Sequence, residues 1–198
     1  MICVPIVGAS MPKALDQIAA AEQVADILEL RLDLIASFDL DLLLKATNKR
    51  IIVTARSKLD GGQYKGNEEE RLGVLHCALE AGVDYIDIEV STQREHLQPF
   101  LESHDTSRII ISYHDFSHTP EDLNPLYEAM NALPGDIIKI VTYARDLSDN
   151  LKIFKLLERA KKENKKLIGL CMGDSGEISR VLAPLYGGFL TFGSIERG

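Results

Sequence analysis

Ile137-Ile138-Lys139-Ile140-Val141 is an apolar run that contains one charged residue, Lys139. A short run rich in β-branched residues is typical of a buried strand. Burying an ammonium group without a partner is costly, and the pKa of such a lysine usually falls instead. An amine with a lowered pKa can attack a ketone and form a Schiff base. Lys139 is therefore a candidate nucleophile, although a lysine near a strand end can also extend its amine to water.

Runs of the same kind recur along the chain, with longer amphipathic stretches between them. The expected strands are Ile2–Val7, Ile27–Leu32, Arg50–Thr54, Tyr85–Glu89, Arg108–Ser112, Asp136–Val141, Lys166–Cys171 and Gly188–Phe192. Apolar residues recur at helical spacing in Ala14–Val24, Glu68–Ala81, Pro120–Leu133 and Leu147–Lys162. This alternation predicts an α/β protein built from parallel βα units, and eight such units predict a (β/α)8 TIM barrel.

The C-terminal end does not fit a complete barrel of this class. Such barrels typically have about 250 residues and end with a helix that covers the eighth strand. This chain of 198 residues stops at Gly198, shortly after the last expected strand. We therefore expect residues 1–198 to form a single barrel domain that lacks its C-terminal helix. The chain would then be part of a longer polypeptide, or the barrel would close in another way.

The composition limits the classes of function. A hydrophobic content of 45% with 26% charged residues is ordinary for a soluble globular domain. The 22 basic and 30 acidic residues give a net charge of −8, which disfavours nucleic acid and anionic lipid as partners. Cys3, Cys77 and Cys171 form no CxxC motif, so neither a disulfide framework nor a zinc site is expected. The N-terminus has no positive residue before Lys13 and no signal-peptide pattern, which predicts a cytoplasmic protein.

Polar residues gather where the expected strands end, and TIM barrels carry their active sites at the carboxyl ends of strands. Glu29 and Arg31 share one face of the second strand, because side chains alternate along a strand. They could bind a ligand or form an internal ion pair. Thr54 and Arg56 share a face at the end of the third strand. The sequence therefore places two arginines at neighbouring strand ends.

Carboxylates end the fourth strand, where Asp87 and Glu89 share a face. They could bind a ligand or only neutralise the arginines. The loop Ser57–Asn67 follows Arg56 and contains Gly61 and Gly62, which could be hinges of a lid or part of an ordinary turn.

His114 follows the fifth strand, one βα unit before Lys139. A histidine beside a Schiff-base lysine can remove an acidified α-proton and return a proton to a leaving hydroxyl. After the seventh strand, a glycine-containing turn from Met172 leads into a helix that carries Arg180. A guanidinium there can hold a carboxylate through two parallel hydrogen bonds, or be a surface charge.

Taken together, these segments resemble the type I 3-dehydroquinate dehydratases (3-dehydroquinases). The matching segments are Glu29-Leu30-Arg31-Leu32-Asp33, Thr54-Ala55-Arg56, Asp87-Ile88-Glu89, Ser112-Tyr113-His114-Asp115-Phe116, Lys139, Met172-Gly173 and Ser179-Arg180. The likeness covers nearly the whole chain, and its specificity lies in the order and spacing of the segments. It implies a cofactor-free and metal-free lyase that dehydrates 3-dehydroquinate to 3-dehydroshikimate in a TIM barrel. This reaction is the third step of the shikimate pathway, which leads to chorismate and the aromatic amino acids.

The resemblance also implies a role for each matched residue. Lys139 would form the imine with the C3 ketone, and His114 would remove the C2 proton and help the C1 hydroxyl leave. The substrate would be bound by Arg180 at its carboxylate, by Glu29, Arg31 and Arg56 at its hydroxyls, and by Met172 and Phe192 against its ring. Asp60, Asp87 and Glu89 would lie behind these groups and support them. The family further implies a homodimer and a possible fusion to, or association with, shikimate dehydrogenase.

Two features depart from the family pattern. Family members continue after the position of Gly198 with a lid segment similar to Ser-Ala-Pro-Gly-Gln and a last helix. Asp60 stands where the family tends to place a glutamate, four residues after the arginine that corresponds to Arg56. The shorter carboxylate would orient His114 less well.

Two other functions are compatible with parts of the pattern. Schiff-base aldolases also carry a lysine on the sixth strand of a barrel, but their substrates are commonly phosphorylated. No glycine-rich phosphate turn joins the seventh and eighth expected strands here. An incomplete barrel could also be a non-catalytic scaffold, although a scaffold has no need for a buried amine near a base. The residues do not distinguish a biosynthetic from a catabolic pathway.

Overall fold

The computed structural model describes residues 1–102 and 108–195 of the chain. It consists of two compact units. The first unit contains Met1–Ile88, Thr92–Ile109 and Phe192–Gly198, and the second contains Glu89–Ser91 and Ile110–Thr191.

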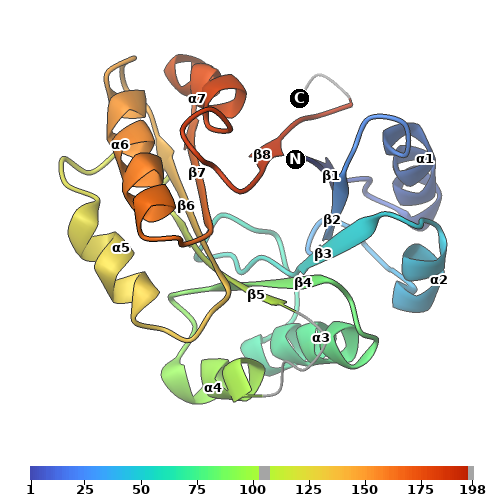
Figure 1. The fold of residues 1–198 in the computed structure, drawn as a ribbon. Coiled ribbons are helices and arrows are strands. Elements are labelled where there is room, and N and C mark those ends of the chain that lie inside the picture. The colour runs from blue at the N-terminus through green and yellow to red at the C-terminus, as the bar shows by residue number, and fades with distance from the viewer. Residues whose placement is uncertain (103–107, 196–198) are drawn as a thin grey trace. The chain divides into compact units, whose positions relative to one another are not determined.

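Strands and helices alternate along the chain (Figure 1). The elements are β1 (Ile2–Ile6), α1 (Met11–Ala21), β2 (Ile27–Arg31), α2 (Leu40–Lys45), β3 (Arg50–Thr54), α3 (Glu68–Glu80), β4 (Tyr85–Glu89), α4 (Arg94–Glu102), β5 (Arg108–His114), α5 (Asn124–Asn131), β6 (Ile137–Tyr143), α6 (Asp149–Lys162), β7 (Leu167–Met172), the 3-10 helix η1 (Asp174–Gly176), α7 (Glu177–Leu182) and β8 (Thr191–Phe192). This order confirms the predicted alternation. None of the helices in the described ranges is long and apolar enough to cross a membrane.

Some element boundaries differ from the predicted ones. Strand β5 extends to His114, because its ladder with β6 continues to the pair His114 and Val141. Strand β8 has only two residues, whereas the sequence predicts Gly188–Phe192. Gly187 has a positive φ of 98° and Gly188 follows it, so the chain is still turning where the predicted strand would begin.

In the first unit, parallel strands run in the order β4, β3, β2 and β1. Arg31 lies beside Thr54 in the β2–β3 ladder, and Thr54 lies beside Asp87 in the β3–β4 ladder. These pairs bring the polar ends of three strands to one edge of the sheet. After β8, Gly193 donates its N–H to Cys3 O at 2.9 Å, so this segment pairs with β1.

Helix α3 begins with a capping box and is joined to the end of β3 by Arg71. A capping box begins the helix, since Asn67 Oδ1 accepts from Glu70 N and Glu70 Oε2 accepts from Asn67 N. One turn later, buried Arg71 donates from Nη1 to Ala55 O at 3.0 Å. Because Ala55 precedes Arg56, this hydrogen bond holds the backbone beside that arginine.

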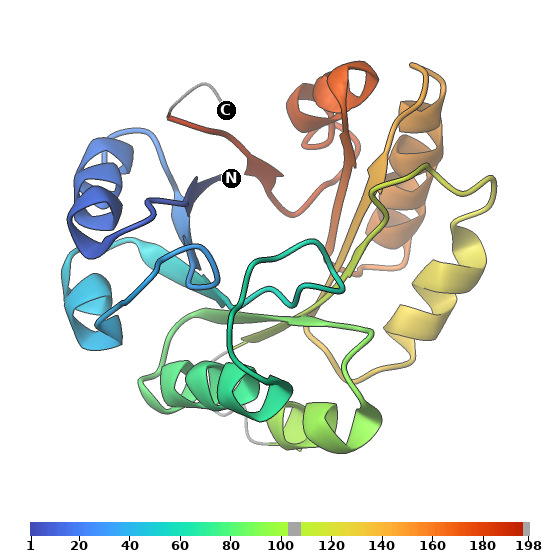
Figure 2. The same cartoon turned by 180° about the vertical axis from the view of Figure 1, so that it is seen from behind.

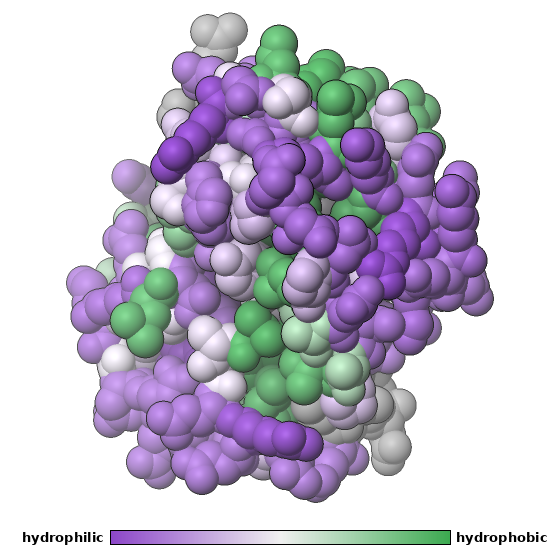
Figure 3. Space-filling view, turned by 90° about the vertical axis from the view of Figure 1, so that its left-hand side faces the viewer, coloured by the Kyte–Doolittle hydropathy of each residue, from purple (hydrophilic) through white to green (hydrophobic). Residues whose placement is uncertain are grey.

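In the second unit, β5, β6 and β7 form a parallel ladder, and α6 runs alongside β7 in both cartoon views (Figures 1 and 2). The helix packs directly on Gly169, where an added Cβ would lie 3.1 Å from Leu157 and 3.2 Å from Ile153. Lys155 and Glu158, on the other side of α6, are exposed. The molecular face in Figure 3 is correspondingly mainly hydrophilic.

The contact between α6 and β7 predicts a large cost for removing its central side chain. Leu157 is 0% exposed, whereas Leu151 in the same helix is 54% exposed. Leu157→Ala is expected to lower the free energy of unfolding by about 2–5 kcal/mol, because it removes buried methyl groups and leaves a cavity. Leu151→Ala is the matched control and should change it by less than about 0.5 kcal/mol. Urea unfolding of both variants measures this, and equal effects would contradict the packing.

Candidate active site

Lys139 lies in the middle of β6 and is 4% exposed, as its apolar flanks predict. Its neighbour across the β5–β6 ladder is Ser112, and His114 follows two residues later opposite Val141. Residues that pair across a parallel ladder, and residues two apart in a strand, point to the same face of the sheet. Lys139, Ser112 and His114 therefore share one face of two adjacent strands, and His114 lies at the carboxyl end of β5.

This shared face is the one that turns away from helix α6. Gly169 points toward α6 and pairs with Ile140, whereas Lys139 pairs with the preceding residue, Ile168. Because side chains alternate along each strand, Lys139 and Ile168 point to the opposite side of the sheet from Gly169. Met172 has the same parity as Ile168, so it lies on the face of Lys139, at the end of β7.

The turn after β7 requires glycine. Gly173 has a positive φ of 80°, and an added Cβ would lie 2.9 Å from the Tyr143 ring. Gly176 approaches the end of β7, where an added Cβ would lie 2.7 Å from the Cys171 backbone. The glycine spacing seen in the sequence therefore reflects a turn packed against β6 and β7.

Arg180 follows a buried serine, Ser179, which the sequence analysis quotes in a matching segment but gives no role. Ser179 Oγ accepts from Cys171 N at 2.8 Å and donates to Gly176 O at 2.7 Å. Asn150, at the start of α6, donates from Nδ2 to Ser175 O at 2.7 Å. Ser179 thus fixes the first turn of α7 to the end of β7, and Asn150 joins η1 to α6. The half-buried Arg180 lies one residue after Ser179. A polar residue directly before Arg180 was the available signal for Ser179.

In the first unit, each candidate polar residue has a defined partner. Thr54 Oγ1 donates to Glu29 Oε1 at 2.9 Å. Arg56 Nη2 donates to Asp87 Oδ1 at 2.9 Å, and both of these side chains are buried. Asp87 thus neutralises Arg56, which is one of the two alternatives that the sequence left open.

Arg31 forms an ion pair with Asp33, whereas the sequence offered a pair with Glu29 as one of two alternatives. Arg31 Nε donates to Asp33 Oδ1 at 2.9 Å, and Arg31 Nη2 donates to Asp33 Oδ2 at 2.8 Å. Burial alone would lower the pKa of Arg31, but the hydrogen bonds to Asp33 and the nearby charge of Glu29 raise it above its ordinary value. Arg31 is therefore a permanent cation.

The remaining predicted residues occupy the ends of β4 and β8 and the glycine loop. Glu89 is buried at the end of β4, and the next residue, Val90, donates its N–H to Ser112 O at 2.8 Å. Asp60 Oδ2 accepts from Ser57 Oγ at 2.8 Å within the loop. Phe192 ends β8 and is half-buried. The contact expected between Asp60 and His114 stays a prediction.

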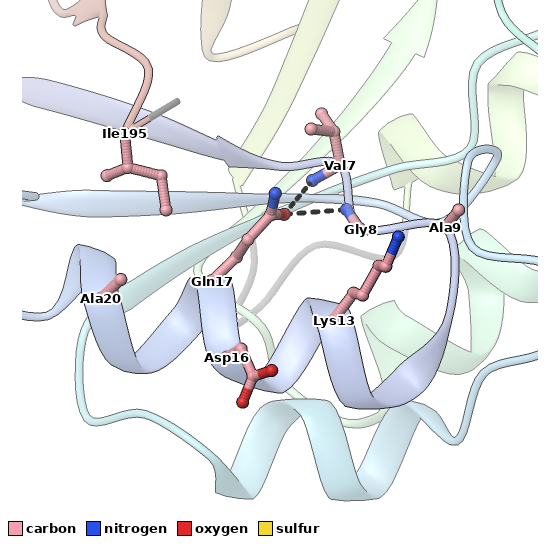
Figure 4. Close-up of a pocket in the computed structure, with 8 residues that line it drawn as sticks. All are labelled: Val7, Gly8, Ala9, Lys13, Asp16, Gln17, Ala20 and Ile195. Carbon is pink, nitrogen blue, oxygen red and sulfur yellow. Dashed lines mark hydrogen bonds between the residues drawn. The ribbon is translucent and has the colours of Figure 1, made fainter. Parts of the chain in front are cut away.

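A cavity of about 570 Å³ lies beside α1 in the first unit (Figure 4). Its lining residues are Val7, Gly8, Ala9, Lys13, Asp16, Gln17, Ala20 and Ile195. Gln17 Oε1 accepts from Val7 N at 2.9 Å and from Gly8 N at 2.8 Å, so this side chain fixes the chain after β1. None of the predicted site residues lines this cavity. No group of three or more His, Cys, Asp and Glu residues in the described ranges is arranged to hold a metal ion.

Comparison with known proteins gives a consistent result. Residues 2–198 match the family model for Type I 3-dehydroquinase. A 3-dehydroquinate dehydratase from Coxiella burnetii is 36% identical over 201 residues, which cover 98% of this chain and 84% of that protein. A bifunctional 3-dehydroquinate dehydratase/shikimate dehydrogenase from Arabidopsis thaliana is 36% identical over 208 residues, and the match spans 99% of this chain but 33% of that protein.

Among solved structures, the type I 3-dehydroquinate dehydratase from Clostridium difficile with covalently modified comenic acid superposes with a TM-score of 0.90. It is 24% identical, and the match covers 98% of this chain and 84% of that one. The likeness shows the fold, and with the order of strands and helices it confirms the (β/α)8 barrel class.

Asp149 supports the turn that follows Lys139's strand. Its buried carboxylate accepts from Arg145 N at 2.9 Å and from Lys152 Nζ at 3.1 Å. Burial alone would raise the pKa of Asp149, but the hydrogen bonds from Arg145, Lys152 and the Asp146 backbone outweigh it and leave the pKa below its ordinary value.

The lowered pKa of Asp149 predicts how stability depends on pH. Above the unfolded pKa of about 3.9 the carboxylate stabilises the fold fully, and this contribution is lost as the pH falls through the lower pKa of the folded state. Asp149→Asn should therefore be less stable than wild type at pH 7, and the difference should shrink as the pH is lowered below about 4. Urea unfolding across this pH range measures it, and a difference that does not change with pH would refute the charge effect.

Proposed function

Because the chain belongs to the type I 3-dehydroquinase family, we propose that it dehydrates 3-dehydroquinate to 3-dehydroshikimate through an imine on Lys139. The observation that carries the assignment of residues is the buried amine of Lys139 on the same sheet face as His114, one strand away. A buried lysine beside a histidine supplies both a nucleophile for a ketone and a base for the adjacent carbon.

The proposed chemistry uses Lys139 as an electron sink. Its neutral amine adds to the C3 ketone, and loss of water gives a protonated imine. His114 then removes the proton from C2, and the electron pair of that C–H bond moves toward the imine nitrogen to form an enamine. The enamine returns this pair as the C1–O bond breaks, and His114 gives its proton to the departing hydroxyl. Hydrolysis of the imine releases 3-dehydroshikimate and restores Lys139.

The proposed binding residues divide the substrate between charged and apolar contacts. Arg180 would bind the carboxylate, and Met172 and Phe192 would contact the ring. The residues assigned to the hydroxyls are Glu29, Arg31 and Arg56. The hydrogen bonds from Thr54 to Glu29 and from Arg56 to Asp87 support this assignment, because they orient the groups before substrate arrives. Asp87, Glu89 and Asp60 would act by holding these groups and His114.

The proposal extends to how the chain is organised in the cell. Both units would be parts of one dehydratase domain, acting in the cytoplasm in the shikimate pathway without a cofactor. A homodimer is proposed because two-fold dimers are the commonest closed assemblies of soluble proteins. The bifunctional Arabidopsis relative supports the further proposal that a chain of this kind can be joined to, or associate with, shikimate dehydrogenase.

Covalent trapping tests the imine. The protein is incubated with 3-dehydroquinate and sodium borohydride, and its intact mass is measured. Wild type should gain a reduced adduct that peptide mapping places on Lys139, because borohydride reduces the imine to a stable amine. Lys139→Ala should gain none. Lys155→Ala, which removes an exposed lysine of α6, is the control and should react as wild type does. Absence of an adduct from folded wild-type protein would refute the imine mechanism.

A histidine variant separates imine formation from proton transfer. His114→Ala should still be trapped on Lys139, because the amine and the carboxylate-binding arginine are intact. Its turnover should fall about 10²–10⁴-fold, the usual contribution of a positioned acid–base group. Product formation is followed by the absorbance of the conjugated enone. His96→Ala, at an exposed histidine, is the control. Undiminished turnover by His114→Ala would exclude it as the base.

A further inference from the structure

Asp33 is a buried carboxylate that the proposed reaction does not use. Its side chain is 0% exposed, whereas that of its partner, Arg31, is 22% exposed. Resting on the proposed function, we infer that Asp33 is a positioning residue that orients the Arg31 guanidinium toward the substrate and ties the glycine loop, residues 57–67, to this arginine.

The geometry between Asp33 and Arg31 fixes the plane of the guanidinium. Two parallel hydrogen bonds, from Nε to Oδ1 at 2.9 Å and from Nη2 to Oδ2 at 2.8 Å, join one edge of the guanidinium to the carboxylate. A guanidinium has about five N–H donors, so this contact leaves about three of them on its other edges. A buried carboxylate thus sets the direction in which a partly exposed cation presents its remaining donors.

The same carboxylate also binds the glycine loop. Gln63 donates its backbone N–H to Asp33 Oδ2 at 3.2 Å. Gly62, just before it, lies against the end of β3, where an added Cβ would overlap Arg56 O. The loop begins directly after Arg56, which is the second arginine proposed to bind a substrate hydroxyl. Asp33 therefore connects Arg31 with the loop that follows Arg56.

This arrangement depends on the negative charge of Asp33. Its two oxygens accept three N–H groups, two from Arg31 and one from Gln63. Asparagine has the same shape but only one acceptor oxygen, and its NH2 group would face donors. Asp33→Asn should therefore break a hydrogen bond to the Arg31 guanidinium or the hydrogen bond from Gln63 N. It would do so without removing a group that contacts the substrate.

A purely structural role for Asp33 is the alternative. Buried ion pairs often add little net stability, because desolvation offsets their attraction. The two roles make different predictions for substrate affinity, for coupling to Arg31 and for opening of the loop.

The first arm measures affinity through borohydride trapping on Lys139. In Asp33→Asn the half-saturating concentration of 3-dehydroquinate and the KM should rise by about tenfold or more, equivalent to about 1.4 kcal/mol. The maximal adduct at saturating substrate should match wild type, and kcat should fall less than KM rises. Asp33→Glu keeps the charge and should retain more affinity than Asp33→Asn. Glu128→Gln is the matched control, because Glu128 also binds an arginine, Arg159, at the surface.

The second arm is a double-mutant cycle with Arg31. If Asp33 acts through this arginine, Asp33→Asn should change KM by less than about twofold when Arg31 is already alanine, because coupled residues do not add. Equal effects of Asp33→Asn in both backgrounds would overturn the inference. So would an unchanged KM in folded Asp33→Asn, and a loss of stability alone would then mark a structural role.

The third arm follows the loop independently of activity. Lys58 and Lys65 are exposed trypsin sites within it. Asp33→Asn should be cleaved there faster than wild type, whereas Arg31→Ala should keep the bond from Gln63 and the wild-type rate. Equal cleavage of wild type and Asp33→Asn would overturn the loop link. If wild type gives no adduct on Lys139, the proposed function fails and the substrate role of Asp33 with it, while trypsin still decides the loop link.

Discussion

The ladder between β5 and β6 is the constraint on which the proposed chemistry depends. Ser112 pairs with Lys139 and His114 pairs with Val141, so His114 lies on the same face as Lys139, two residues further along the ladder. A shift of one residue would turn Lys139 toward the helices and leave its charge among apolar side chains. Packing of α6 on Gly169 fixes which face that is. The position of the proposed nucleophile, Lys139, therefore follows from ordinary strand pairing and from the absence of a side chain at Gly169.

In the first unit, the main physical constraint is that arginines lie at or near the ends of apolar strands and must be neutralised there. Buried charges are tolerated when they are paired and hydrogen-bonded. Arg31 has Asp33, Arg56 has Asp87, and Arg71 has Glu68 together with a backbone carbonyl. Each of these three arginines thus has its own carboxylate. The pairs hold Arg31 and Arg56 in fixed orientations at neighbouring strand ends, and Arg71 reaches the end of β3 from helix α3.

Much of the fold could be predicted from sequence because strands and helices leave periodic patterns. The alternation of elements, the burial of Lys139 and the gathering of polar residues at strand ends all follow from such patterns. The sequence marks Asp33 only as the last residue of the segment Glu29–Asp33 and does not reveal its contacts. Asp33 lies beyond β2, and its partners depend on how the chain turns there. Ser179 and Asn150 bind backbone atoms at the turn after β7, and the spacing of polar and apolar residues in the sequence does not reveal such contacts. Strand β8 was predicted too long because β propensity does not register the turn at Gly187.

The buried pair of Arg56 and Asp87 has a consequence for how the strands find their alignment. A slip of β4 against β3 by two residues would preserve the inward and outward alternation of every side chain, so hydrophobic burial alone would hardly oppose it. In the native ladder, Thr54 lies beside Asp87, and this brings the carboxylate to Arg56. The slipped ladder would separate the two charges and leave both without their partner in a dry environment. The ion pair between Arg56 and Asp87 therefore favours the native alignment of β4 and β3 over a two-residue slip that apolar side chains alone would accept.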